Sequence, residues 1–416
     1  LVADLRLYDI QAATDRSIDI VLPSDFDQMR ERWVTKPLDY MTSVHLSPDG
    51  DRVVLVSRGT VFVAPTGDGR WVRVSRKEGI RNRAARFLGD GKSLMVLSDE
   101  SGEWEFYRFP ADGLGPGEPL TTGAKVLRFD GIPSPDGRRI AFTDKDQQLW
   151  IYDISAKKLD KAAVSANGMF NGLAWSPDSR WLAYGQTADN EFQQIALLDV
   201  ESGKTAMLTD DRVDSYDPAW SPDGQWLYFL SDRYFRSVVG SPWGPRQPEP
   251  FFDKTTKIYA AALVPGVKFP FEPANELAPA GKESAESPKG KTEPRAQASA
   301  KTAGATEGSA GEKPAKEAKA AVPRVIIDFA GIRDRIFEVP LPSGVYSQIS
   351  LTDKILFFVE WETRTTGRAK LQAVEIKNRN IQTKTLVEGI RSSYELSADG
   401  KRILILKDGD LYVLDA

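Results

Sequence analysis

The chain has 416 residues, of which 41% are hydrophobic and 10% aromatic, so it can bury a substantial core. Its formal net charge is −4 and it carries no basic block, which argues against a nucleic-acid partner because phosphate binding needs clustered Lys and Arg. It has no cysteine, which excludes disulfides, thiol catalysis and zinc sites built on Cys.

Two strands are predicted near the start, at residues 4–10 (D-L-R-L-Y-D-I) and 17–22 (S-I-D-I-V-L). No turn hairpin of the kind that recurs in the rest of the chain precedes them. We therefore interpret residues 1–34 as the outer strands of a preceding blade plus a linker.

A turn sequence then recurs along the chain. S-P-D-G stands at residues 47–50, 134–137 and 221–224, S-P-D-S at 176–179 and S-A-D-G at 397–400, and degenerate copies lie at 87–91 and 350–354. Pro sets φ at the second turn position, Asp can accept backbone N–H bonds, and Gly takes the left-handed conformation that closes the turn. The spacing is about 44 residues apart from one long interruption, which indicates repeated units.

Each repeat predicts an antiparallel sheet. Short apolar runs flank the turns, as in W-L-A-Y and R-I-L-I-L, and a further strand follows within about thirty residues. These third strands are expected at residues 60–65, 106–110, 148–154, 194–200, 257–263, 370–376 and 410–416. A polar fourth strand often follows, for example at 204–209. Four strands per repeat is typical of a propeller blade of the WD40-like (PD40) type. We predict an all-β fold, a seven-bladed β-propeller over residues 35–416, with an open ring as the alternative because the last blade stops after its third strand.

Two segments interrupt the repeat. Residues 275–322 are nearly all Ala, Lys, Glu, Pro, Gly, Ser and Thr without an aromatic residue, which predicts a disordered insertion. Residues 234–252 are rich in Pro and aromatics and are predicted to pack over a face of the propeller. An ordinary long loop and a loop that docks a partner or lines the channel are both open there.

The sequence offers no catalytic, cofactor-binding or metal site. His45 is the only histidine, and sister repeats have Ala174 and Ala219 at its position, so we interpret it as structural. There is no G-x-S-x-G elbow, P-loop or G-x-G-x-x-G, and D-K-D at residues 144–146 is too little for a calcium loop. The turn aspartates are predicted to shape turns, and the hairpin tryptophans to pack between blades: Asp49, Asp136, Asp178 and Asp223; Trp175, Trp181, Trp220 and Trp226.

Three longer segments carry a more specific resemblance. They are residues 21–59, residues 97–107 (L-S-D-E-S-G-E-W-E-F-Y) and, most diagnostic, residues 325–349 (V-I-I-D-F-A-G-I-R-D-R-I-F-E-V-P-L-P-S-G-V-Y-S-Q-I). They resemble the seven-bladed propeller of the tricorn protease family in its bacterial branch. One departure is Ala330, where that family often has Asp.

The resemblance implies the non-catalytic propeller of a self-compartmentalising serine protease, whose active site lies in domains beyond residue 416. The propeller would guide or gate peptides toward that site. The implied partners are peptide substrates, other domains of the parent chain and further copies of it. No apolar run approaches the roughly 20 residues that span a bilayer, so a membrane partner is not expected. We predict a cytoplasmic location, with the periplasm as alternative.

Two other classes stay open at this point. One is a TolB-like scaffold that binds a protein or peptide. The other is the propeller of a prolyl-oligopeptidase-like hydrolase, which would place a G-x-S-x-G elbow in a further domain. Whether the parent is an enzyme is therefore uncertain from these residues alone, and the chain itself is predicted to be inactive.

Overall fold

A computed structural model describes residues 5–19, 33, 35–237, 252–273, 322–363 and 368–416. The described part is all-β, with two short 3-10 turns at Pro37–Tyr40 and Ile332–Arg335. It contains one two-stranded sheet, five four-stranded sheets and one six-stranded sheet, all antiparallel. No helix in these ranges has the length and apolarity to cross a bilayer.

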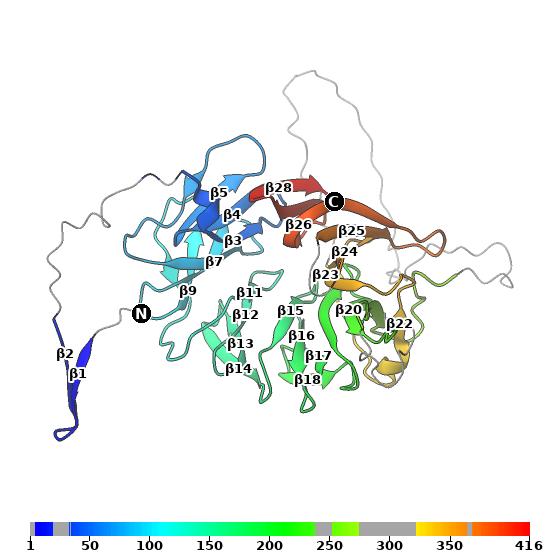
Figure 1. The fold of residues 1–416 in the computed structure, drawn as a ribbon, viewed down its shortest axis with the longest axis horizontal. Coiled ribbons are helices and arrows are strands. Elements are labelled where there is room, and N and C mark those ends of the chain that lie inside the picture. Colours follow the sequence, from blue (N-terminus) through cyan, green and yellow to red (C-terminus); the bar gives the residue numbers. More distant parts are fainter. Residues whose placement is uncertain (1–4, 20–32, 34, 238–251, 274–321, 364–367) are drawn as a thin grey trace, which may run out of the picture.

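The larger sheets follow one another around a common centre, with β7, β11 and β15 near the middle and β14 and β18 at the rim (Figure 1). In chain order their strands are β3–β6 (Met41–Leu46, Arg52–Ser57, Thr60–Pro65, Val72–Arg73); β7–β10 (Asn82–Phe87, Ser93–Ser98, Glu105–Pro110, Glu118–Pro119); β11–β14 (Ile132–Pro133, Arg139–Thr143, Gln148–Asp153, Lys158–Val164); β15–β18 (Asn171–Trp175, Trp181–Thr187, Gln193–Asp199, Lys204–Met207); and β19–β22 (Ser215–Trp220, Trp226–Asp232, Thr256–Ala262, Ile336–Glu338). This is the radial arrangement of a propeller.

The six-stranded sheet comprises β23–β28 (Val345–Leu351, Ile355–Trp361, Ala369–Glu375, Thr383–Leu396, Arg402–Lys407, Asp410–Asp415). Its fourth strand, β26, has 14 residues and pairs on one side with β25 and on the other with β27. Ile390 takes part in both ladders, next to Gly389 with φ of 73°. A single strand therefore joins what the sequence predicted as two separate units.

The predicted third strands are all present, within one residue of their expected bounds, as β5, β9, β13, β17, β21, β25 and β28. The predicted fourth strand at 204–209 is β18, and it is shorter. Fourth strands β6 and β10 have only two residues each. The fourth strands vary in length, up to the seven residues of β14.

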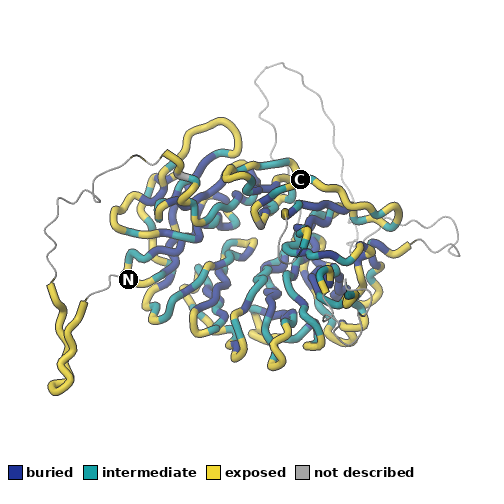
Figure 2. Tube along the Cα trace, viewed as in Figure 1, coloured by how far each residue is buried: buried dark blue, intermediate teal, exposed yellow. Residues whose placement is uncertain are grey.

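The hydrophobic core lies between neighbouring sheets. Most second strands are largely buried, β8 completely, and they contribute residues to the clusters between the sheets. The prediction that the hairpin tryptophans pack in the core is confirmed: Trp175, Trp181, Trp220 and Trp226 are each at most 8% exposed. Trp175 and Trp220 also donate their indole N–H across a sheet boundary, to Ile132 O and Ala174 O, both at 3.0 Å. Figure 2 shows the exposed surface confined mainly to the loops.

The first strands form a separate hairpin, β1 (Arg6–Asp9) with β2 (Thr14–Ser17). Strand β1 lies within the predicted strand at 4–10, whereas β2 ends where the second predicted strand was expected to begin. Every residue of the hairpin is exposed, as the yellow segment at the left of Figure 2 shows. Its assignment to a preceding blade stays a prediction.

Two predictions fall largely on parts of the chain that are not described. The proposed disordered insertion at 275–322 lies outside the described residues, apart from its last residue. Of the predicted face-covering segment 234–252, only residues 234–237 and 252 are described. There the Phe235 and Phe252 rings meet edge to face, with centroids 5.8 Å apart, so the two ends of this loop touch.

Candidate functional site

The innermost strands of the sheets, which we call the inner wall, differ in exposure, and most residues of β7 are buried. Most residues of β3, β15 and β23 are half-buried, whereas most residues of the adjoining second strands β4, β16 and β24 are buried. In a propeller whose centre was filled, the innermost strands would be the most buried. The partial exposure of β3, β15 and β23 leaves side chains of these three strands accessible to water.

A bulge recurs on this wall. The pairing of the first and second strands shifts register in six places, between Met41/Ser43, Arg83/Arg86, Asn171/Ala174, Tyr216/Ala219, Ser347/Ile349 and Ile390/Tyr394. In four of these the bulge contains a left-handed residue: Ala84 (φ 49°), Gly172 (φ 57°), Asp217 (φ 49°) and Gln348 (φ 51°). Bulges redirect side chains and interrupt backbone pairing between the first and second strands.

Hydrogen bonds connect three successive bulges. Asp217 Oδ2 accepts the N–H of Gln348 at 3.0 Å, and Gln348 Oε1 accepts the N–H of Tyr394 at 3.1 Å. The Tyr394 hydroxyl lies 2.8 Å from Ser350 Oγ. Burial raises the pKa of the Asp217 carboxyl, because removal of water disfavours its charged form more than the Gln348 N–H favours it. Each bulge side chain thus holds the next bulge in place.

The wall also carries charged groups. His45 Nδ1 lies 2.9 Å from Glu395 Oε2, which joins β3 to β26. This contact fits the interpretation of His45 as structural. Burial lowers the pKa of Arg86 on β7, partly offset by the charges of Glu395 and Asp130. The Arg86 side chain makes no hydrogen bond or ion pair within the described part of the chain, and its Nε is buried without a partner.

The recurring turns form a belt on one face of the ring. In five of them the Ser Oγ donates to the Asp two residues on, at 2.5–2.7 Å, and also accepts the N–H that re-enters the sheet. The prediction that the turn aspartates shape turns is therefore in agreement with the geometry. Neighbouring turns also bond to each other, through Asp399 N to Pro48 O (3.0 Å), Arg52 Nη2 to Gly91 O (3.0 Å) and Asp136 N to Ser179 Oγ (3.1 Å).

The belt is interrupted between the fifth and sixth turns. A cavity of about 340 Å³ separates Asp223 from Asp353 there, with Trp226, Pro270 and Leu351 in its lining. Val325, the first residue of the segment 325–349, contacts both the fourth and the fifth turns of the belt. Val325 donates its N–H to Asp178 Oδ2 at 2.8 Å and lies against Gly224 of the next turn. This contact could not be predicted from sequence patterns because 147 residues separate its two partners.

No catalytic or metal constellation is assembled on either face within the described residues. They hold no group of three His, Asp or Glu side chains that could ligate a metal ion. In the D-K-D segment, Asp144 is buried and accepts the N–H groups of Asp146 and Gln148 and the indole N–H of Trp150 at 2.7 Å. That carboxylate fixes the β12–β13 connection.

Comparison with known proteins supports the resemblance. A family model described as the tricorn protease second beta propeller domain matches residues 41–416. A tricorn protease homolog of Saccharolobus solfataricus is 24% identical over 423 residues, covering 99% of this chain and 34% of that protein. Tricorn protease homolog 1 of Streptomyces coelicolor is 26% identical over 389 residues, covering 86% of this chain and 32% of that protein.

The fold agrees with these matches. The crystal structure of the tricorn protease superposes with a TM-score of 0.71 at 18% identity, over 99% of this chain and 36% of that one. The chain spans about a third of the length of these relatives. Residues 41–416 account for most of the chain, and the chain belongs to the family of the tricorn protease second β-propeller domain.

Proposed function

We propose that this chain is the non-catalytic propeller of a tricorn-like serine protease, and that it guides extended peptides toward an active site elsewhere in the parent protein. The observation that carries the proposal is the half-exposed inner wall with its repeated bulges. A peptide needs hydrogen-bonding partners for its own backbone when it leaves water. Bulge groups facing the centre supply them without a fixed sequence requirement.

The finer architecture belongs to the same proposal. We count seven blades, with β23–β25 and the first half of β26 as the sixth, and the second half of β26 with β27 and β28 as the seventh. The centre of such a ring is too narrow for a folded domain and admits an extended chain. Residues 1–34 would then belong to a preceding blade and linker, and residues 275–322 to a disordered loop of the fifth blade.

The cellular setting is also proposed. The parent protein would degrade peptides in the cytoplasm as a homo-oligomer, with this propeller contacting its other domains. Gating would come from the inner wall, where Arg86 on β7 and Asp217 on β19 provide ionisable side chains. Support comes from the family match over residues 41–416.

Photocrosslinking tests the path. The probe is a biotinylated unstructured 12-residue peptide with a central benzophenone side chain, irradiated with the 416-residue chain and mapped by peptide mass spectrometry. We expect crosslinks on β3, β7, β19, β23 and β26. A Ser347→Trp variant should reduce them, because its indole would occupy space at the bulge of β23.

The control is Ser202→Trp, an exposed position in the turn after β17, which should leave the crosslinks unchanged. Crosslinks confined to outer strands, or equal reduction by both variants, would exclude passage through the centre. Fluorogenic short peptides should not be hydrolysed by the purified chain, and hydrolysis would contradict its non-catalytic role.

A further inference from the structure

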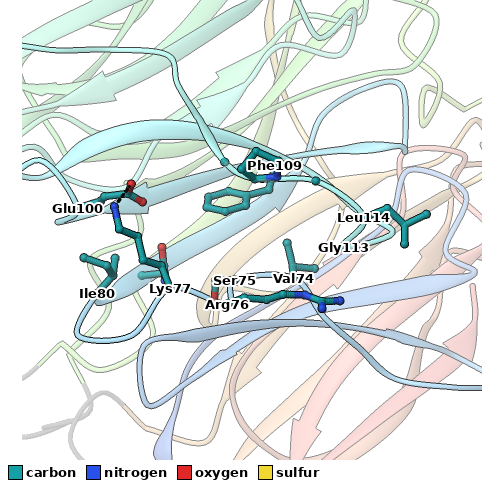
Figure 3. Close-up of a pocket in the computed structure, with 13 residues that line it drawn as sticks. Val74, Ser75, Arg76, Lys77, Ile80, Glu100, Phe109, Gly113 and Leu114 are labelled. Carbon is teal, nitrogen blue, oxygen red and sulfur yellow. Dashed lines mark hydrogen bonds and ion pairs between the residues drawn. The ribbon is translucent and has the colours of Figure 1, made fainter.

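A second hollow lies between the β3–β6 and β7–β10 sheets and reaches Asn82, the first residue of β7. It has a volume of about 460 Å³. One side is the segment from Val74 to Ile80, which connects β6 to β7, and the other is the loop 113–117 between β9 and β10 (Figure 3). We call it the inter-blade cleft. Neither the sequence analysis nor the proposed peptide path uses it.

The apolar part of the inter-blade cleft is preformed. Val74 and Phe109 are buried at 2% and 6% exposure and form its floor. The loop G-L-G-P-G packs closely because its glycines lack side chains: a Cβ on Gly117 would lie 2.3 Å from the Phe109 ring, and one on Gly113 would lie 2.8 Å from Val72. The loop nevertheless presents Leu114 to solvent at 84% exposure. An exposed Leu beside an apolar hollow favours contact with an apolar ligand group.

The polar part has one free cation. Lys77 Nζ is held by Glu100 Oε1 at 2.6 Å, so those two charges offset each other, as the dashed line in Figure 3 shows. Arg76, on the same segment, is exposed and makes no hydrogen bond or ion pair within the described ranges. The net charge of the lining is therefore positive. A guanidinium of this kind pairs best with a carboxylate.

The cleft also has an unmatched acceptor. Asn82 lines it, is 4% exposed, and donates from Nδ2 to Gly59 O at 2.8 Å. That bond fixes the orientation of the amide, and it leaves Oδ1 buried with no partner. A buried acceptor without a donor is costly, so a ligand N–H that reached it would be favoured.

We propose that the inter-blade cleft binds the C-terminal residue of a short peptide with an apolar last side chain. The carboxylate pairs with Arg76, the last amide N–H approaches Asn82 Oδ1, and the side chain covers Val74 and Phe109 beneath Leu114. One residue at a peptide C-terminus carries all three groups. This inference rests on the proposed function only in that both take a peptide as the ligand. The inter-blade cleft is a separate site from the proposed path through the centre of the ring.

Fluorescence anisotropy tests the site with the 416-residue chain. The probe is fluorescein-labelled Ala-Ala-Ala-Phe with a free carboxylate, compared with the same peptide as its amide and with Ala-Ala-Ala-Gly. We expect saturable binding of the free acid. Amidation should weaken it about tenfold, because a hydrogen-bonded ion pair is lost. Replacement of Phe by Gly should weaken it by a similar factor, because the apolar contact is lost.

Variants then assign the contacts. Arg76→Gln should weaken binding of the acid about tenfold and leave binding of the amide unchanged, a coupling that a merely structural role would not produce. Leu114→Ser should weaken binding of both Phe peptides by about threefold. Arg70→Gln, an exposed arginine outside the lining, is the matched control and should change nothing.

Any one of three results would contradict peptide binding in the inter-blade cleft. They are equal binding of the acid and the amide, the same loss of affinity in Arg70→Gln as in Arg76→Gln, and no saturation up to about 1 mM peptide. Passage of peptides through the centre of the ring is measured separately, by photocrosslinking. Crosslinks on the innermost strands should persist in Arg76→Gln, so either proposal can fail alone.

Discussion

In the S-P-D-S turn, a serine stands at the position where most of the sister turns have glycine. Ser179 stands where five sister turns have Gly, and it keeps the left-handed conformation with φ of 60°. That conformation costs a non-glycine residue about 1–2 kcal/mol. The Ser179 hydroxyl, which is buried, accepts the N–H of Asp136 in the preceding turn at 3.1 Å. The bond to the neighbouring blade offsets the backbone strain.

This balance predicts an order among substitutions at Ser179. Ser179→Ala keeps the strain and loses the bond, so it should lower the free energy of unfolding by about 1–2 kcal/mol. Ser179→Gly loses the bond but removes the strain, so its effect should be about 1 kcal/mol smaller. Urea denaturation measures both. If the Gly variant proved the less stable of the two, the hydroxyl would not be what compensates the turn.

At the level of elements, the family-diagnostic segment acts as a strap on the turn belt. Its start is tied to the fourth turn by the bond from Val325 N to Asp178, and the Phe329 ring lies 5.8 Å from that of Trp181. Further along, Arg335 donates to the backbone oxygens of Asp328 and Ala330 and holds the strap folded. The departure at Ala330 does not affect this clamp, which uses only the backbone there.

The strap predicts unequal roles for equivalent turn aspartates. Asp178→Ala should destabilise the chain by about 1 kcal/mol more than Asp136→Ala, because only Asp178 also accepts a bond from the strap. Chemical denaturation of the two variants gives the difference. Equal losses would mean that the Val325 contact does not contribute to stability.

The elements that the sequence predicted well are those specified by neighbours along the chain. A turn with Pro, Asp and Gly between two apolar runs fixes the inner hairpin wherever it occurs, and the third strands followed at their expected positions. The joined strand β26 and the contact of Val325 with Asp178 were not predictable, because each depends on pairing between distant segments. The inter-blade cleft was missed for the same reason: Arg76 and Leu114 meet only when two blades pack.

For the whole molecule, the contact between the first and last sheets decides whether the ring is closed. It consists of the His45–Glu395 pair, the bond from Asp399 N to Pro48 O, and a cluster of only four buried hydrophobic residues, Leu46, Val53, Ala64 and Leu404. The other inter-sheet clusters are larger. Since stability scales with buried apolar area, this seam is expected to open before the others.

Leu404→Ala tests the seam. Because Leu404 is buried, this substitution should lower the free energy of unfolding by about 2–4 kcal/mol. Leu182→Ala, in a larger cluster, should lower it by a similar amount. Hydrogen exchange should separate the two. Leu404→Ala should accelerate exchange in β3 and β27, whereas Leu182→Ala should leave both strands protected. Slow exchange of β3 in Leu404→Ala would show that the seam is held by its polar contacts.

The shared strand β26 also limits how this chain could be rearranged. A circular permutant needs new termini at a connection whose two sides do not depend on one continuous strand, and the link between β14 and β15 meets that condition. A cut near Gly389 does not, because the ladders to β25 and β27 meet at Ile390. The six-stranded sheet β23–β28 should therefore be kept as one unit in any rearranged chain.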